Sequence, residues 1–351
     1  MVFEKITFDN SKKLEIPVKL HQYTWGYYFK QYATALSHII NVSLKKENRL
    51  DRMQMAVMFI FRHTIELLLK RELENAGKVV PITHDLYLLA IDLDDKDILS
   101  FLNNAVMLAP QSEGDCFKYI ESKEGKKHFR NEILDVLPLI SSFLSLPCLK
   151  KSTLGNIVFD VKSKRLLHEW SFYTIETRTL GHIKTQYDFL ISSILNSIKS
   201  DELKIEHVYL PLLFLIRHSL EVGFKDNISE VFDCLTNSQK KKYCSKHSLE
   251  ALLNIVIQFI DEAQKNFTSL DDTIQKELAY YMPLTEQLMK TMHELDNRSL
   301  SFRFPVDENG IFMNVPFSRN VLSDAVAAFQ TADPFISLSL SVLKYEGYIN
   351  I

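Results

Sequence analysis

The chain has little glycine, proline or cysteine, and each shortage excludes certain classes of protein or kinds of site. Its 351 residues include only 9 Gly and 10 Pro, which excludes a collagen-like or low-complexity protein. Its four cysteines share no metal-like spacing and form no C-x-x-C motif, so we expect reduced thiols. No uncharged apolar run reaches the ~18 residues of a membrane span, and the segment MVFEKITFDN lacks an apolar signal region. These features together predict a cytoplasmic protein.

Common phosphate-binding and nucleophile motifs are also missing. The chain contains no G-x-x-x-x-G-K-[ST], no G-x-G-x-x-G and no G-x-S-x-G, which argues against a phosphate loop and a serine-hydrolase elbow. The formal net charge is −3, so no overall positive field attracts nucleic acid. Any contact with RNA needs a local patch, and we expect no cofactor and no membrane partner.

The chain does carry one unusual peptide twice. Residues 59–70 are FIFRHTIELLLK, and residues 214–225 are FLIRHSLEVGFK. Shorter matches before and after this peptide occur in the same order in both halves. The last of them pairs FKY at 117–119 with FRF at 302–304. An internal repeat of this kind indicates a duplicated architecture. Five residue types recur at identical spacing, namely Phe59/Phe214, Arg62/Arg217, His63/His218, Glu66/Glu221 and Lys70/Lys225.

The repeat also divides the chain. Its pattern breaks near residues 150–155, so we predict a first repeat over 1–151 and a second over 152–351. No long flexible linker lies between them, and we expect the halves to pack as one body. Outside the main peptide, we pair Trp25 with Trp170, His38 with His182 and His84 with His247.

Apolar periodicity predicts a mainly α-helical chain with a few short hairpins. The predicted helices cover residues 26–45, 50–75, 131–147, 178–199, 206–230, 248–267, 272–295 and 319–331. Polar turns between β-type residues predict hairpins at 6–16, 117–129, 156–167 and 302–315. Asn309-Gly310 is the strongest of these turn signals.

The repeated peptide places a polar cluster on an otherwise apolar helix. At about 100° per residue, Arg62, His63, Glu66 and Lys70 fall within one quarter of the helix circumference. A helix that is apolar nearly all round is buried, so the polar quarter should face a cleft or an interface. Glu66 is four residues from both Arg62 and Lys70, which predicts an ion pair with each. The second copy repeats the arrangement.

Three interpretations of the cluster are open. It can be a structural ladder of ion pairs that seals the contact between the halves. It can be a paired site in which Arg and Lys bind an anion and His transfers a proton. The two His-x-x-Glu segments also resemble, in reversed order, the Glu-x-x-His pairs of carboxylate-bridged metal sites. The neighbouring Arg and Lys would repel a cation, so we expect no metal.

The Arg-His-x-x-Glu-x-x-x-Lys helix, followed by a His-Asp-Leu or His-Ser-Leu helix start, resembles the HEPN superfamily (higher eukaryotes and prokaryotes nucleotide-binding). The stretch from Phe302 to Gly310 is also similar to bacterial stand-alone members. The resemblance implies two tandem helical-bundle repeats that pack as an intramolecular pseudo-dimer. Many members are metal-independent RNases in toxin, CRISPR-associated or anti-phage systems. It therefore implies RNA or nucleotide binding at the cleft between the repeats, in a bacterial defence or toxin setting.

Carried over by position, the resemblance also implies roles for individual residues. The catalytic residues are Arg62, His63, Arg217 and His218. The nucleotide-binding residues are Glu66, Lys70, His84, Glu221, Lys225 and His247. If the chain is an enzyme, it is a metal-independent endoribonuclease. The alternative function is a non-catalytic protein-interaction or structural module with a partner protein, and the sequence leaves the oligomeric state open.

The chain departs from the catalytic family pattern at one point. That pattern needs a second His further along the same helix, where this chain has apolar residues at 67–69 and glycine or apolar residues at 222–224. The His residues beside the two arginines, or His84 and His247 from the next helix, would have to supply the missing group. We therefore expect RNA or nucleotide binding with weak or absent cleavage.

Overall fold

The computed structural model of the chain is built almost entirely from α-helices, which confirms the predicted class. It describes residues 5–8, 11–16, 24–44, 50–105, 116–119, 128, 133–155, 157, 171–173, 179–231, 236–266, 272–297, 299–313 and 317–345. The α-helices are α1 (Trp25–Leu44), α2 (Gln54–Asn75), α3 (Leu86–Leu93), α4 (Lys96–Asn104), α5 (Val136–Leu144), α7 (Leu180–Lys199), α8 (Tyr209–Val231), α9 (Asn237–Cys244), α10 (Leu249–Asn266), α11 (Asp272–Tyr281), α12 (Thr285–Asn297) and α13 (Val321–Tyr345). Short 3-10 helices are η1 (Ser11–Leu14), η2 (Leu50–Met53), η4 (Pro147–Leu149), η5 (Ile205–His207), η6 (Met282–Leu284) and η7 (Leu300–Phe302).

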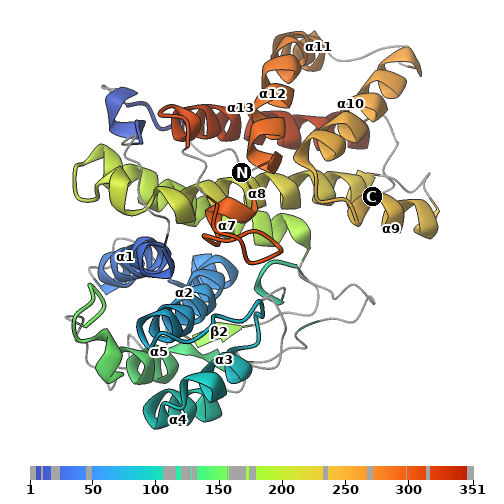
Figure 1. Cartoon of the computed structure of the whole chain (residues 1–351). Coiled ribbons are helices and arrows are strands. Elements are labelled where there is room, and N and C mark those ends of the chain that lie inside the picture. Colours follow the sequence, from blue (N-terminus) through green and yellow to red (C-terminus); the bar gives the residue numbers. More distant parts are fainter. Residues whose placement is uncertain are drawn as a thin grey trace.

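Helices α1, α2, α7 and α8 form the centre of the molecule. Within each half, α1 packs on α2 and α7 packs on α8, and the halves meet where α2 contacts α7 and α1 contacts α8. Figure 1 shows α1 to α5 on one side of this junction and α7 to α13 on the other. All residues at 54–70 of α2 and 209–225 of α8 are buried. This burial agrees with the nearly continuous apolar circumference of both helices.

The outer helices cover the two buried ones. Helix α3 packs on α2 and α4 packs on α3, whereas α10 and α13 both pack on α8 and α12 lies against both of them. Asp85 and Asp95 cap α3 and α4, because each carboxylate accepts hydrogen bonds from two backbone N–H groups of the first turn.

Helix α13 runs further than the predicted helix at 319–331. It continues through Pro334, although a proline inside a helix costs roughly 3 kcal/mol. Phe335 and Ile336 are buried directly after it, and the Asn227 side chain of α8 donates a hydrogen bond to the Ile336 carbonyl. Packing against α8 therefore offsets the proline.

The β structure differs from the predicted hairpins. Strand β1 (Ile133–Asp135) pairs antiparallel with β2 (Ser171–Tyr173), so the prediction of a helix over 131–147 is wrong at its start. Residues 11–14 form η1, which includes part of the polar turn of the predicted hairpin at 6–16. In the described part of 302–315, residues 302–313, an isolated bridge joins Val306 and Phe312 around a tight turn. The hairpins at 117–129 and 156–167 lie almost wholly outside the described residues.

Candidate functional site

The first polar cluster is organised around Glu66. Its Oε1 accepts from Lys70 Nζ at 3.0 Å and from His84 Nδ1 at 2.7 Å, and its Oε2 lies 3.4 Å from Arg62 Nη1. The predicted pairing of Glu66 with Arg62 and Lys70 is thus confirmed. Arg62 Nη2 also donates to the His84 carbonyl at 2.7 Å. His84 is therefore held by its backbone and by its ring, through two residues of one helix.

The second cluster repeats this arrangement around Glu221. Its Oε2 accepts from Arg217 Nη1 at 2.6 Å, and its Oε1 accepts from Lys225 Nζ at 2.8 Å and from His247 Nδ1 at 2.9 Å. Arg217 also donates to the His247 carbonyl. An additional carboxylate, Asp296, lies 3.2 Å from Arg217 Nη2.

Each cluster is covered by a short loop from the other half. His63 Nε2 donates to the Arg303 carbonyl at 3.1 Å, within the FRF tripeptide of the second half. His218 Nε2 donates to the Lys118 carbonyl at 3.2 Å, within the FKY tripeptide of the first half. The two loops that match in sequence have therefore exchanged places in the structure.

Buried tyrosines fix the same two loops. Tyr32 of α1 donates its hydroxyl to the Phe302 carbonyl at 3.0 Å, and Tyr187 of α7 donates to the Phe117 carbonyl at 3.2 Å. Burial raises the pKa of both tyrosines, so both hydroxyls keep the proton that they donate. Each tyrosine also packs against the histidine of its own half.

Two glutamines join the halves at the start of the buried helices. Gln186 Oε1 of α7 accepts from the Met55 backbone N–H at 2.7 Å, and Gln31 Oε1 of α1 accepts from the Leu210 N–H at 3.5 Å. Backbone N–H groups in the first turn of a helix have no partner within that helix. Each half therefore satisfies one such group in the other.

Four rings form a continuous stack along the junction. Phe59 stacks on Phe214 with centroids 4.4 Å apart, and His63 and His218 extend the stack at 5.6 and 5.7 Å. The guanidinium of Arg303 lies over both phenylalanine rings, at 5.8 and 5.7 Å from their centroids. The two clusters thus lie on either side of one aromatic contact.

The contacts correct part of the predicted alignment. Phe59/Phe214, Tyr32/Tyr187 and Gln31/Gln186 are all 155 positions apart, as are the first residues of α1 and α7. By this register Trp25 corresponds to Leu180, whereas Trp170, its predicted match, lies outside the described residues.

The match of His38 with His182 is wrong, because the two residues are not equivalent in this register. His38 lies deep inside α1, whereas His182 is in the first turn of α7, where it completes a capping box with Thr179. The resemblance between the two short peptides does not reflect equivalent places in the fold.

Burial keeps the two stacked histidines neutral. It lowers the pKa of His63 from the usual 6.5 to about 4, against the opposing attraction of Glu66. It lowers the pKa of His218 to about 3, against the opposing attraction of Glu221. In the neutral state Nε2 carries the proton that each ring donates to the loop carbonyl.

The two glutamates are ionised despite their burial. Burial alone would raise the pKa of Glu66, but the charge of Lys70 and the hydrogen bond from His84 hold it well below the usual range. The pKa of Glu221 is likewise held low, mainly by Arg217. Each buried carboxylate is thus neutralised by the cations around it, as buried charges require.

Most of the predicted site residues are inaccessible. Arg62, His63 and His218 are at most 2% exposed and Arg217 is 8% exposed. Glu66, Lys70, Glu221 and Lys225 are buried as well. The two loop histidines differ, because the side chain of His84 is 29% exposed and that of His247 is 59% exposed.

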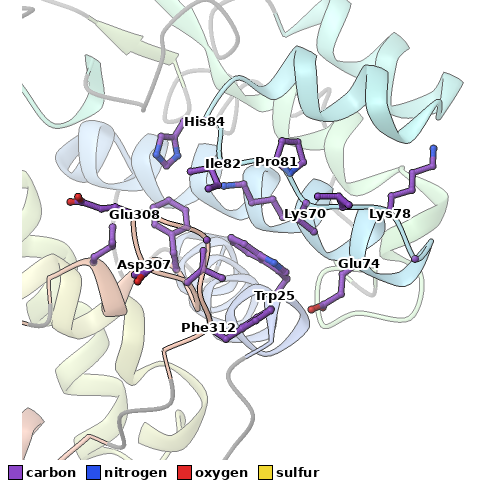
Figure 2. A pocket seen from close by; sticks show the side chains of 17 residues that line it. Trp25, Lys70, Glu74, Lys78, Pro81, Ile82, His84, Asp307, Glu308 and Phe312 are labelled. Carbon is purple, nitrogen blue, oxygen red and sulfur yellow. The ribbon is translucent and has the colours of Figure 1, made fainter.

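A groove of about 550 Å³ opens beside the first cluster. It lies between residues 77–84, which follow α2, and residues 304–312 of the other half, with Trp25 at its base (Figure 2). Lys70 Nζ is 4.8 Å from the ring centroids of both Trp25 and Phe304. Two of the predicted site residues, Lys70 and His84, line this groove.

Sequence reasoning did not find the groove. The sequence singled out Lys70, His84 and the Asn309-Gly310 turn, but apolar wall residues such as Val79 and Ile82 carry no motif. Among the described residues, no His, Cys, Asp and Glu side chains gather into a group of three that could hold a metal. No described helix has the length and apolar character needed to cross a membrane.

Comparisons with protein families, curated proteins and solved structures found no match to this chain. Its function therefore has to be argued from the geometry of the clusters and the groove.

Proposed function

We propose that the chain is a non-catalytic binding module, made of two HEPN-like repeats that pack as an intramolecular pseudo-dimer. The observation that carries the proposal is the position of His63 and His218. Each is buried, and each donates a hydrogen bond to a backbone carbonyl of the opposite half. The repeated peptide then serves to lock the halves together, and ligands bind at the groove.

The chemistry of the clusters supports a structural role. A general acid or base must come within about 2.6–3.2 Å of the proton that it transfers. His63 and His218 reach only protein groups, and their low pKa values keep them neutral at pH 7. The cations that would grip a phosphate are already paired with Glu66 and Glu221. These cations therefore already have carboxylate partners, which weakens their hold on an added phosphate.

Binding of RNA or a nucleotide is the second candidate, and His84 favours it. Glu66 holds Nδ1 of His84 and Arg62 holds its carbonyl, which leaves Nε2 as the ring nitrogen available to a ligand in the groove. Trp25 and Phe304 add aromatic surface of the kind on which bases stack. This candidate includes the bacterial defence or toxin setting that the family resemblance implies.

Incubation with mixed RNA in the presence of a chelator tests the proposal. We expect no cleavage by the wild-type chain, because neither buried histidine meets a substrate. Matched double variants, His63→Asn/His218→Asn and His84→Ala/His247→Ala, identify the group responsible if cleavage occurs. Cleavage that either variant abolishes while circular dichroism and thermal unfolding stay unchanged would show that the chain is an RNase and reject the proposal.

A further inference from the structure

The exposed apolar side chains of the described residues are concentrated around the groove. Seven large ones are exposed, and four of them belong to the two segments that border the groove: Val79 (91%), Ile82 (65%), Ile311 (64%) and Phe312 (47%). Leu88 and Ile91 lie on α3, which follows the first segment, and only Tyr280 on α11 is elsewhere. Contiguous exposed apolar surface of this kind marks a site of interaction.

The walls of the groove are ordered by their own hydrogen bonds. Asp307 Oδ1 accepts from the backbone N–H groups of Asn309 and Ile311, both at 2.9 Å, and so shapes the turn. Gly310 follows with a φ of +78°, and a Cβ atom there would lie 3.0 Å from Ile82. The two walls therefore touch through a residue without a side chain. A groove that is already shaped loses little conformational entropy when a ligand binds.

The rim of the groove carries more carboxylates than available cations. Glu74, Asp307 and Glu308 line it, and Figure 2 shows Glu308 and Glu74 at opposite ends. Lys70 is paired with Glu66, and Lys78 points away from Trp25 and donates to the Asp92 carbonyl at 2.6 Å. An apolar floor between two acidic ends suits a ligand with apolar centres and basic flanks.

We infer that the groove binds a segment of a partner protein that carries two apolar anchors flanked by lysine or arginine. The inference rests on the proposed non-catalytic binding function and names the partner class for it. The acidic rim disfavours the phosphates of RNA. A second copy of this chain is also acidic overall, with a net charge of −3. His84 supplies a polar group that can bind the backbone of the segment.

Selection of a random peptide library on the full chain tests this inference. We expect enriched peptides to share two apolar residues next to Lys or Arg. Fluorescence anisotropy of an enriched peptide should show a loss of affinity of roughly tenfold or more in Ile82→Asp/Phe312→Asp, since a few buried anchors carry most binding energy. Glu74→Lys/Glu308→Lys should weaken binding too, and more at low salt than at high salt.

Tyr280→Asp is the matched control, because it also places a charge at an exposed apolar residue. Figure 1 shows α11 at the opposite end of the molecule from α4, and binding should be unchanged in this variant. All variants should melt at the wild-type temperature, since each replaced side chain is exposed or at the groove rim.

Several outcomes would overturn the inference. These are a selection without enrichment, enrichment of acidic peptides, or equal binding by the Ile82→Asp/Phe312→Asp variant. Competition by a single-stranded RNA oligonucleotide at the groove would assign the site to nucleic acid. Sedimentation that shows a dimer dissociated by the same variant would assign it to a second copy. Each of these leaves the proposed function standing, because only cleavage of RNA rejects that.

Discussion

Phe59 of the first half stacks on Phe214 of the second, with an angle of 15° between the rings. The pair occupies the centre of the junction, and Arg303 covers both rings. Phe59→Ala or Phe214→Ala should lower the free energy of unfolding by about 3–5 kcal/mol, because each leaves a cavity in a packed core. Urea unfolding measures this change. A loss below about 1 kcal/mol for either variant would show that the junction repacks without the stack.

Removal of a cluster carboxylate should destabilise the chain through the charges that remain. Glu66→Gln removes the carboxylate that buried Arg62 and Lys70 share, and we expect a loss of about 3–5 kcal/mol in urea unfolding. The double variant Glu66→Gln/Lys70→Met should recover part of it. Glu250→Gln removes a carboxylate that pairs with exposed His293 and should cost less than about 1 kcal/mol. Similar losses in both single variants would contradict a buried network.

Acidification should weaken the fold through His63 and His218 first. Their pKa values in the folded chain are about 4 and about 3, below the usual 6.5. The unfolded chain therefore binds these protons at higher pH, so stability is fully present above pH 6.5 and falls as the pH drops toward 4. His63 alone should account for roughly 3 kcal/mol at pH 4.

Urea unfolding between pH 7 and pH 4 measures this dependence. His63→Asn should flatten the slope, because the variant has no ring to protonate in the unfolded state. His293→Asn, at an exposed histidine, is the control and should keep the wild-type slope. An unchanged slope in His63→Asn would mean that other groups govern the acid sensitivity.

Another buried network lies in the second half. Its response to acidification should be the opposite of the response of His63 and His218. Lys184 of α7 donates to both Asp188 and Asp333, and Ser219 donates to Asp188. Burial raises the pKa of Asp188 even with Lys184 beside it. Lys184→Met leaves two buried carboxylates together and should cost about 3–5 kcal/mol at pH 7. The loss should shrink on acidification, because the raised pKa of Asp188 lets its carboxylate take up a proton at a higher pH than usual. A loss that grows on acidification would be inconsistent with this account.

The sequence predicts most accurately the structural features that depend on residues close together in the chain. Long helices with a full apolar period, such as α1, α2, α7 and α8, are found within a few residues of their predicted ends. The ion pairs of Glu66 with Arg62 and Lys70 follow from four-residue spacing alone. Periodicity did not reveal the short helices α4 and α9, because eight or nine residues give too little of it and their starts depend on single capping side chains. The start of α3 was indicated only by the His-Asp-Leu motif of the family resemblance.

Contacts between distant segments could not be predicted in the same way. His63 and His218 bind backbone carbonyls, which every residue has, so no sequence signal marks Arg303 or Lys118 as partners. The groove joins residues 77–84 to residues 304–312, more than 200 positions apart. The end of α13 could not be predicted either, because packing keeps the helix intact through Pro334.

The exchange of the FKY and FRF loops makes each half incomplete by itself. A fragment that ends at residue 151 would keep the charges around Glu66 but lose the Arg303 carbonyl and the Phe304 ring that cover them. The complementary fragment would lose the cover supplied by Lys118. The charged helix of each half therefore depends for its cover on a tripeptide of the other half.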